Sequence, residues 1–67
     1  MESLSEYKGK RIQITSNQVG RVSFFKGDLI DADSNFVKFK DDVLGVILIA
    51  INSITRIEDI EWMKNYP

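Results

Sequence analysis

The segment that most restricts the possible fold is residues 43–51, VLGVILIAI, in which no position is polar. A half-buried strand alternates apolar and polar side chains, whereas this run offers apolar side chains to both of its faces. Its continuous apolar part, Val46 to Ile51, is much shorter than the roughly 20 residues that a membrane-spanning helix needs. We therefore predict a β-strand covered on both sides. In so short a chain, the cover must come from a terminal segment or from another molecule.

Other runs of the sequence also predict strands. Residues 10–15 alternate Ile12 and Ile14 with polar side chains, which is typical of a strand with one buried face. Residues 20–32 form an extended run too long for a flat strand, and its apolar parity changes around Gly27, as expected at a bulge or a sharp bend. The remaining predicted strands are residues 36–40 and 54–57. Short polar segments predict turns at residues 16–18, 33–35, 41–42 and 52–53.

Together these elements predict an all-β fold in a single domain. Five short strands joined by tight turns, the second strongly bent, are typical of a small antiparallel SH3-like barrel, closed or partly open. Leu4 and Tyr7 are spaced as on one face of a helix and predict a short N-terminal helical turn. We expect the domain to span residues 1–67, with its core at about 7–58 and a short tail at 59–67.

The composition excludes several kinds of chemistry. The chain has no cysteine and no histidine, which rules out disulfides, thiolate nucleophiles, imidazole catalysis and the usual zinc sites. Asp31, Asp33 and Asn35, with Asp42 eleven positions after Asp31, imitate the spacing of calcium-loop ligands. Phe36 stands where that loop needs glycine, so turn chemistry explains these residues better. We therefore expect no metal, no cofactor and no catalytic residues, and predict that the protein is not an enzyme.

The charge pattern restricts the location and the partners. Nine lysines and arginines against ten aspartates and glutamates give a net charge of −1, so no overall basic field attracts nucleic acid or anionic membranes. The first six residues include two glutamates, whereas an export signal begins with a basic region and an apolar run. We expect a cytoplasmic protein that does not bind membranes.

Three stretches of the sequence resemble the Sm-like protein family. Residues 27–39, GDLIDADSNFVKF, resemble the first Sm motif in the placement of glycine, leucine, Asp33 and Phe36. Residues 50–54, AINSI, are similar to the corner between the fourth and fifth strands of the bacterial Hfq-type RNA chaperones. Residues 7–12, YKGKRI, look like the usual entry from a short helix into the first strand. The resemblance implies an Sm-like barrel with a short N-terminal helix.

The resemblance also implies a homo-oligomeric ring. In Sm-like rings the fourth strand of one subunit pairs with the fifth strand of the next, and such pairing would cover the second face of the apolar run. The candidate interface residues are Val46, Ile47, Leu48, Ile49, Ile51 and Ile54.

Family members usually bind single-stranded RNA, with an aromatic or planar side chain stacking on a base and a cation from the corner between strands four and five. Here Phe36 follows the turn between the second and third strands, and Lys38 and Lys40 share its strand parity. Leu48 and Ile49 stand where Hfq-type proteins have a Lys-His pair. The candidate RNA-binding residues are Tyr7, Arg11, Asn35, Phe36, Lys38, Lys40, Asn52 and Arg56.

An alternative function is a structural or protein-interaction module that keeps the SH3-like barrel and does not bind RNA. The surface lysines would then form a solvated face that protects edge strands from pairing. The tail carries Ile60, Trp62, Met63 and Tyr66, an unusual concentration of large apolar side chains. We expect this tail to pack on its own barrel or on a neighbouring subunit, or to dock a protein partner.

Overall fold

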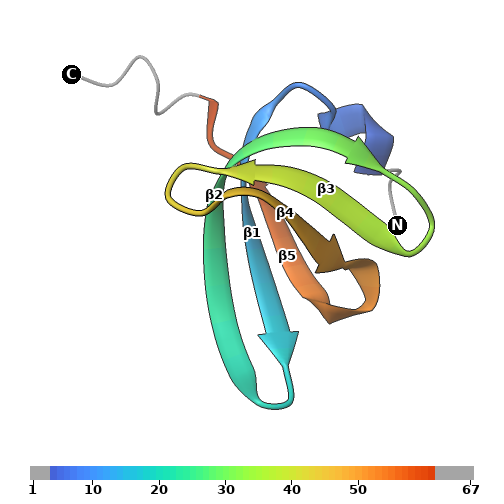
Figure 1. Ribbon diagram of the computed structural model, residues 1–67, viewed down its shortest axis with the longest axis vertical. Coiled ribbons are helices and arrows are strands. Elements are labelled where there is room, and N and C mark those ends of the chain that lie inside the picture. Colours follow the sequence, from blue (N-terminus) through green and yellow to red (C-terminus); the bar gives the residue numbers. More distant parts are fainter. Residues whose placement is uncertain (1–3, 62–67) are drawn as a thin grey trace.

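The computed structural model describes residues 4–61, in which all strands belong to one antiparallel sheet (Figure 1). The elements are the 3-10 helix η1 (Leu4–Tyr7), β1 (Arg11–Gln18), β2 (Arg21–Ala32), β3 (Phe36–Asp41), β4 (Gly45–Ala50), the 3-10 helix η2 (Ile51–Ser53) and β5 (Ile54–Asp59). The strand order is β4-β3-β2-β1-β5. The predicted all-β class with five antiparallel strands is confirmed. Trp62, Met63 and Tyr66 lie outside the described residues.

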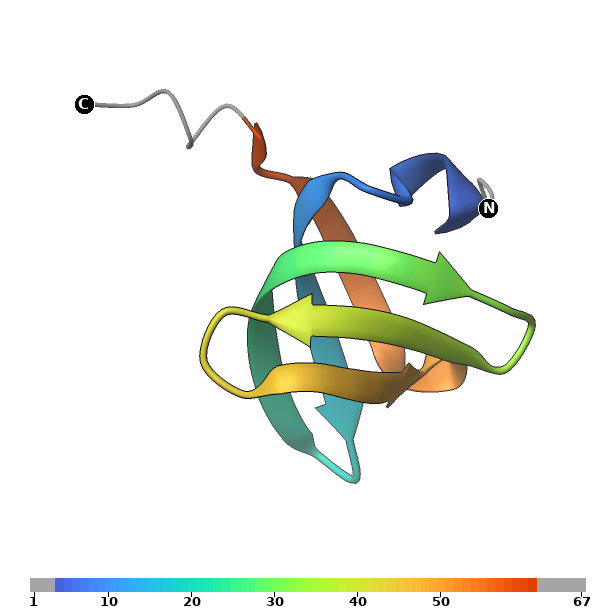
Figure 2. The same ribbon diagram turned by 45° about the horizontal axis from the view of Figure 1, so that its top comes forward.

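β2 is the strand that shapes the sheet. Its residues 21–28 pair with β1 and its residues 27–32 pair with β3, so it sweeps from one hairpin into the other (Figure 2). Gly27 lies at the crossing, opposite both Ile12 and Asp41. A Cβ atom on Gly27 would lie 1.9 Å from the backbone oxygen of Lys40, so glycine is required for this close approach.

The predicted change of parity at Gly27 is wrong. Phe25, Gly27 and Leu29 alternate along β2 and lie on the same, less exposed face, while Phe24 lies on the other face and is exposed. The register between β2 and β3 shifts two residues later, between Leu29 and Asp31. Gly27 therefore allows the backbones of β2 and β3 to approach closely without a break in the alternation of β2. The irregular pairing of β2 with β3 lies beyond it, between Leu29 and Asp31.

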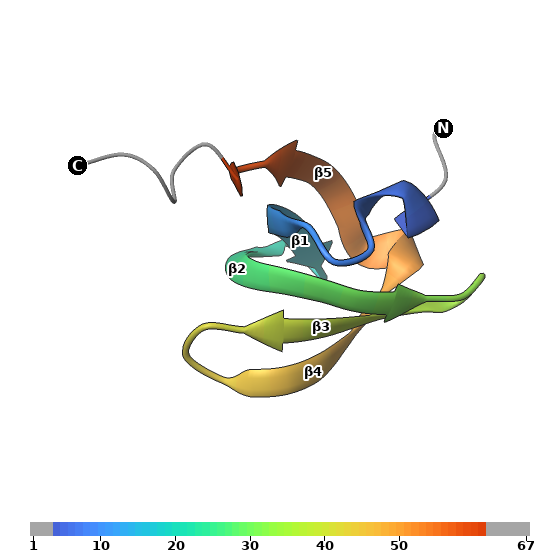
Figure 3. The ribbon, with the colours of Figure 1, turned by 90° about the horizontal axis from the view of Figure 1, so that it is seen from above.

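The sheet is curved but not closed. β4 and β5 are its two edges, and within residues 4–61 they do not pair with each other (Figure 3). Neither edge strand has a second neighbour in this part of the chain. The prediction allowed a closed or a partly open barrel; the sheet of a single copy is not closed, and two unlike strand edges remain for other contacts.

The inner face of the sheet forms the core. Ile12 and Ile14 of β1 are fully buried, as their alternation with polar residues predicts. Tyr7 and Leu4 of η1 pack against this core from outside the sheet. The buried core residues are Ile12, Ile14, Leu29, Val37, Phe39 and Ile49. No helix in the described part of the chain is long and apolar enough to cross a membrane.

Two predicted boundaries are wrong for identifiable reasons. β1 continues through residues 16–18, where a turn is predicted, because Ser16 is buried on the inner face and donates a hydrogen bond to Ser53 Oγ at 3.0 Å. The turn consists instead of Val19 and Gly20, whose φ angles are 53° and 78°. β4 begins only at Gly45, because Asp41 holds the two preceding residues in a turn.

Within residues 4–61, the two faces of β4 differ in their cover. Ile49 is buried and Ile47 is partly buried on the inner face, whereas Val46 and Leu48 are exposed on the outer face. Nothing among the described residues covers these two outward side chains.

Candidate functional site

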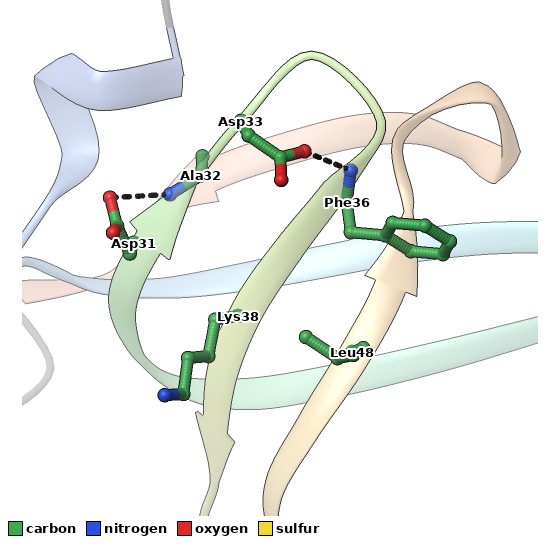
Figure 4. Close-up of a pocket in the computed structure, with 6 residues that line it drawn as sticks. All are labelled: Asp31, Ala32, Asp33, Phe36, Lys38 and Leu48. Atoms are coloured by element: carbon green, nitrogen blue, oxygen red, sulfur yellow. Dashed lines mark hydrogen bonds between the residues drawn. The ribbon is translucent and has the colours of Figure 1, made fainter.

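The outer face of β3 and β4 contains a hollow of about 170 Å³ (Figure 4). Two of the side chains that line it are large, apolar and exposed: Phe36 at the start of β3, and Leu48 of β4. Phe36 exposes 48% of its surface, which leaves ring area accessible to a ligand. The hollow is lined by Asp31, Ala32, Asp33, Phe36, Lys38 and Leu48.

The turn before β3 fixes the position of Phe36. Asp33 Oδ1 accepts hydrogen bonds from the backbone N–H groups of Asn35 and Phe36, both at 2.7 Å. These bonds, that of Phe36 first, hold the pKa of Asp33 below its ordinary value because they stabilise the ionised carboxylate. The carboxylate of Asp33 therefore stabilises the turn, and the turn fixes the backbone position of Phe36.

Lys38 and Lys40 lie on the same face as Phe36, as predicted, since all three are exposed residues of β3. Lys38 lies opposite Asp31 of β2 and Leu48 of β4. Lys40 likewise has an aspartate of β2 on one side and a valine of β4 on the other. The outer face of β3 and β4 therefore combines cations with aliphatic side chains, but an aspartate of β2 lies opposite each of these two lysines.

The structure brings three of the predicted RNA-binding residues to one end of the sheet. The backbone N–H of Ile51 in η2 donates to the backbone oxygen of Asn35 at 2.9 Å, which ties the corner before β5 to the turn before β3. Asn52 follows Ile51 in that corner and is exposed. Asn35, Phe36 and Asn52 therefore lie near one another, although seventeen positions separate the first from the last.

Arg11 is held away from this hollow. One of its guanidinium nitrogens donates to Asp42 Oδ1 at 3.0 Å and the other contacts Oδ2, while Asp28 lies 3.9 Å away. The hydrogen bond to Arg11 is the main reason that the pKa of Asp42 lies below its usual range, and the same bond raises the pKa of Arg11. Arg11 joins the beginning of β1 to the turn after β3, a role that the sequence analysis missed.

Two further candidates also lie elsewhere. Tyr7 is partly buried and packs against the core from η1. Arg56 lies on the edge strand β5, opposite Thr15 of β1, with its Nη2 3.4 Å from Glu58. Of the predicted RNA-binding residues, only Phe36 and Lys38 line the hollow, while Asn35 and Asn52 lie at the neighbouring end of the sheet.

The predicted interface residues divide between the two faces of the sheet. Val46 and Leu48 point outward, Ile49 belongs to the core, and Ile47, Ile51 and Ile54 are partly buried against it. A hollow of about 270 Å³ separates the inner side of β4 from the end of the β1–β2 hairpin, where Ser16 and Phe25 line it. It marks the gap that the unclosed sheet leaves.

The groups at the Phe36 hollow can bind a ligand through stacking, charge and apolar contact. Its groups are an aromatic ring, an ammonium, two aliphatic side chains and two carboxylates, one of them bonded within its own turn. Among residues 4–61 no three potential metal-ligating side chains gather in one place.

Comparisons with protein-family models, with curated proteins and with solved structures find no match for the chain. The assignment of a function therefore depends on the residues and the geometry of this molecule.

Proposed function

We propose that this chain is a non-enzymatic, cytoplasmic, Sm-like module that assembles edge to edge into a homo-oligomeric ring and binds single-stranded RNA through Phe36. The observation that carries the proposal is the open sheet, with β4 at one edge and β5 at the other. An unpaired edge is a template for another strand. Because the two edges are different strands, β4 of one copy pairing with β5 of the next is a heterologous contact, and its repetition gives a ring where the rotation between neighbouring copies closes.

Exposed apolar residues on the edge strand support self-assembly. Val46 and Leu48 lie on the outer face of β4, and large apolar side chains gathered at an edge are typical of surfaces that another protein covers. A neighbouring β5 at this edge would approach Val46 and Leu48 and would also narrow the gap between β4 and the β1–β2 hairpin.

The RNA part of the proposal depends on Phe36. A base stacked on an exposed aromatic ring contributes about 1–3 kcal/mol, and the Asp33 turn holds the backbone from which the Phe36 ring extends. Lys38 supplies a cation for the phosphate backbone, while the amides of Asn35 and Asn52 supply donors and acceptors for a base edge. A ring would repeat these groups once for each subunit.

A second candidate, a protein-interaction module without RNA binding, is favoured by the pairing of charges. Arg11 bonds to Asp42, Arg56 contacts Glu58, and Lys38 has Asp31 across the strand pair. Arg11 and Arg56, whose charges are already paired with carboxylates, would release few counterions from RNA and contribute little affinity, and the aspartate opposite Lys38 lowers the local positive potential.

The ring is tested by measuring the mass of the native protein. Sedimentation at micromolar concentration should give a multiple of 7.7 kDa. Val46→Lys combined with Leu48→Lys should dissociate the assembly and leave the fold intact, since both side chains are exposed. The control is Val19→Asp, which also replaces an exposed apolar side chain by a charged one but lies in the β1–β2 turn; it should leave the mass of the assembly unchanged. A stable monomer of the unaltered protein would exclude the ring.

RNA binding is tested by titrating labelled oligouridylate and oligoadenylate at low and high salt. The affinity should fall steeply with salt, and Phe36→Ala should weaken it by about 5- to 150-fold, the equivalent of one lost stacking contact. Phe24→Ala, which removes an exposed aromatic ring outside the hollow, should change it little. Flat titrations at low salt would exclude RNA and leave the protein-interaction module.

A further inference from the structure

A second apolar hollow, which the proposed function does not use, lies between β2 and the turn that joins β3 to β4. It has a volume of about 450 Å³, and we call it the Phe24 groove. Phe24 exposes 65% of its surface, Val43 90% and Leu44 64%. The groove is lined by Phe24, Phe25, Lys26, Asp41, Asp42, Val43 and Leu44.

Hydrogen bonds hold the walls of this groove in place. Asp41 Oδ2 accepts from the backbone N–H groups of Val43 and Leu44, both at 2.9 Å, which keeps the turn in one conformation. The backbone N–H of Asp42 donates to the oxygen of Lys26 at 2.9 Å and ties the turn to β2. The apolar side chains are thus directed outward by a fixed backbone, a costly arrangement unless something covers them.

We propose that the Phe24 groove is covered by residues 62–67 of the same chain, WMKNYP. The described chain leads to the groove: the N–H of Ile60 donates to the backbone oxygen of Arg11 at 3.1 Å. The guanidinium of Arg11 bonds in turn to Asp42, which lines the groove. Arg11 therefore connects the end of the described chain, through its backbone, to a residue of the groove wall, through its side chain.

The length of the segment is sufficient. Arg11 lies opposite Asp28, and Phe24 is four residues along β2 from that point, roughly 13 Å at the rise of a strand. Six extended residues span roughly 20 Å, which is more than this distance, so the segment is long enough to reach Phe24.

The composition of the segment also matches the groove. Trp62, Met63 and Tyr66 are large and apolar, and half of the segment consists of such residues. Aromatic rings pack favourably edge to face with Phe24, and a methionine sulfur packs well against a ring edge. Lys26 at the wall can place its ammonium over an indole face. The segment and the groove therefore each offer the apolar surface that the other needs.

Trp62 is the only tryptophan in the chain, so its fluorescence tests the proposal directly. In the full chain the emission should be blue-shifted, and iodide should quench it several-fold less than in a peptide of residues 60–67. Phe24→Asp and Leu44→Asp should each move the emission and the quenching to the values of the peptide, with an unchanged far-ultraviolet circular dichroism spectrum. Both replaced side chains are exposed, so the fold should tolerate the changes.

Variants outside the Phe24 groove test whether shielding of Trp62 depends on the proposed ring or on the RNA-binding residue. Val19→Asp, Phe36→Ala and the Val46→Lys, Leu48→Lys double variant should all keep the shielded emission at every protein concentration. Nuclear Overhauser contacts between the Trp62 indole and the Leu44 methyl groups should be present in the wild type. The proposal is overturned by peptide-like emission of the full chain, by emission that does not respond to the groove variants, or by shielding that disappears on dilution.

Discussion

At the scale of single residues, Gly27 has the strictest steric requirement. A Cβ atom would meet the backbone oxygen of Lys40 at 1.9 Å, and a backbone atom can move aside only if β2 and β3 separate. We expect Gly27→Ala to lower the free energy of unfolding by about 1–3 kcal/mol, as overpacking of a core does. Urea unfolding at one fixed protein concentration measures this. Gly9→Asn is the control, because a Cβ there meets open space; an equal loss in both variants would contradict the steric explanation.

Val19 occupies an unfavourable backbone conformation. Its φ of 53° lies in the left-handed region, where a β-branched side chain is strained by roughly 1–2 kcal/mol. Val19→Asn should therefore stabilise the protein by about 1 kcal/mol, since asparagine followed by glycine is preferred in two-residue hairpin turns. The thermal unfolding midpoint checks this. Val22→Asn, an exposed position in regular β2, should lower the midpoint instead, and a rise in both variants would argue against strain at Val19.

At the scale of elements, two buried serines connect β1 to η2. Ser16 Oγ donates to Ser53 Oγ at 3.0 Å, and Ser53 Oγ donates to the backbone oxygen of Ala50 at 2.7 Å. Ser53→Ala leaves the buried Ser16 hydroxyl without this acceptor and should cost about 1–3 kcal/mol. Ser16→Ala keeps the second bond and should cost less.

The coupling between the two serines is measured by a double-mutant cycle. Ser16→Ala combined with Ser53→Ala removes both hydroxyls, so the double variant should lose less stability than the sum of the single variants. Strict additivity of the three unfolding free energies would show that the bond between the serines contributes nothing.

The ion pair of Arg11 and Asp42 connects β1 to the turn after β3 and makes the stability depend on pH. The pKa of Asp42 is lower in the folded than in the unfolded chain, so its contribution is complete above the unfolded value of about 3.9. It is lost as the pH falls through the lower folded value. Because the pair is partly exposed, the loss should be no more than about 1 kcal/mol.

Carboxyl-carbon resonances of Asp42, followed by NMR during acid titration, check this expectation. In Arg11→Gln the pKa of Asp42 should return toward its ordinary value, because the principal hydrogen bond and the nearby charge are both removed. An unchanged titration in that variant would show that Arg11 is not the cause of the lowered pKa.

At the scale of the whole molecule, eight large apolar side chains of residues 4–61 are exposed, Val46 and Leu48 of the β4 edge among them. If β4 and β5 of neighbouring copies pair, the folded state is stabilised by mass action, and the thermal unfolding midpoint should rise with protein concentration. The Val46→Lys, Leu48→Lys double variant should abolish that dependence, while Val19→Asp should keep it. Calorimetry over a wide range of concentrations measures the effect, and a constant midpoint of the wild type would count against association.

Much of the fold follows from local pattern. The alternation of Ile12 and Ile14 predicts β1 with its buried face, and Asp33 followed by Phe36 predicts the turn that leads into β3. The end of β1 is different, because Ser16 is polar and yet buried, and its partner Ser53 is 37 positions away. No local pattern reveals such a pair.

The candidate site shows the same division. Phe36 and Lys38 share a face because neighbouring side chains of a strand alternate, which the sequence alone predicts. Arg11 is indistinguishable in sequence from a free surface cation, and only the fold places Asp42 beside it. Phe24 and Phe25 are adjacent aromatic residues of which the sequence does not say which is buried; Phe24 is exposed because it has the opposite parity to the inward Gly27 and Leu29.

The sequence by itself therefore determined the number of strands, their approximate positions, and the turn chemistry at Asp33, because each depends on side-chain alternation or on contacts within a few residues. Only the tertiary structure decided which polar groups are buried, which cations are neutralised, and that β4 and β5 remain as separate edges. These features depend on contacts between residues far apart in the chain, whose energies are set when the strands pair and not by the order of residues along any one of them.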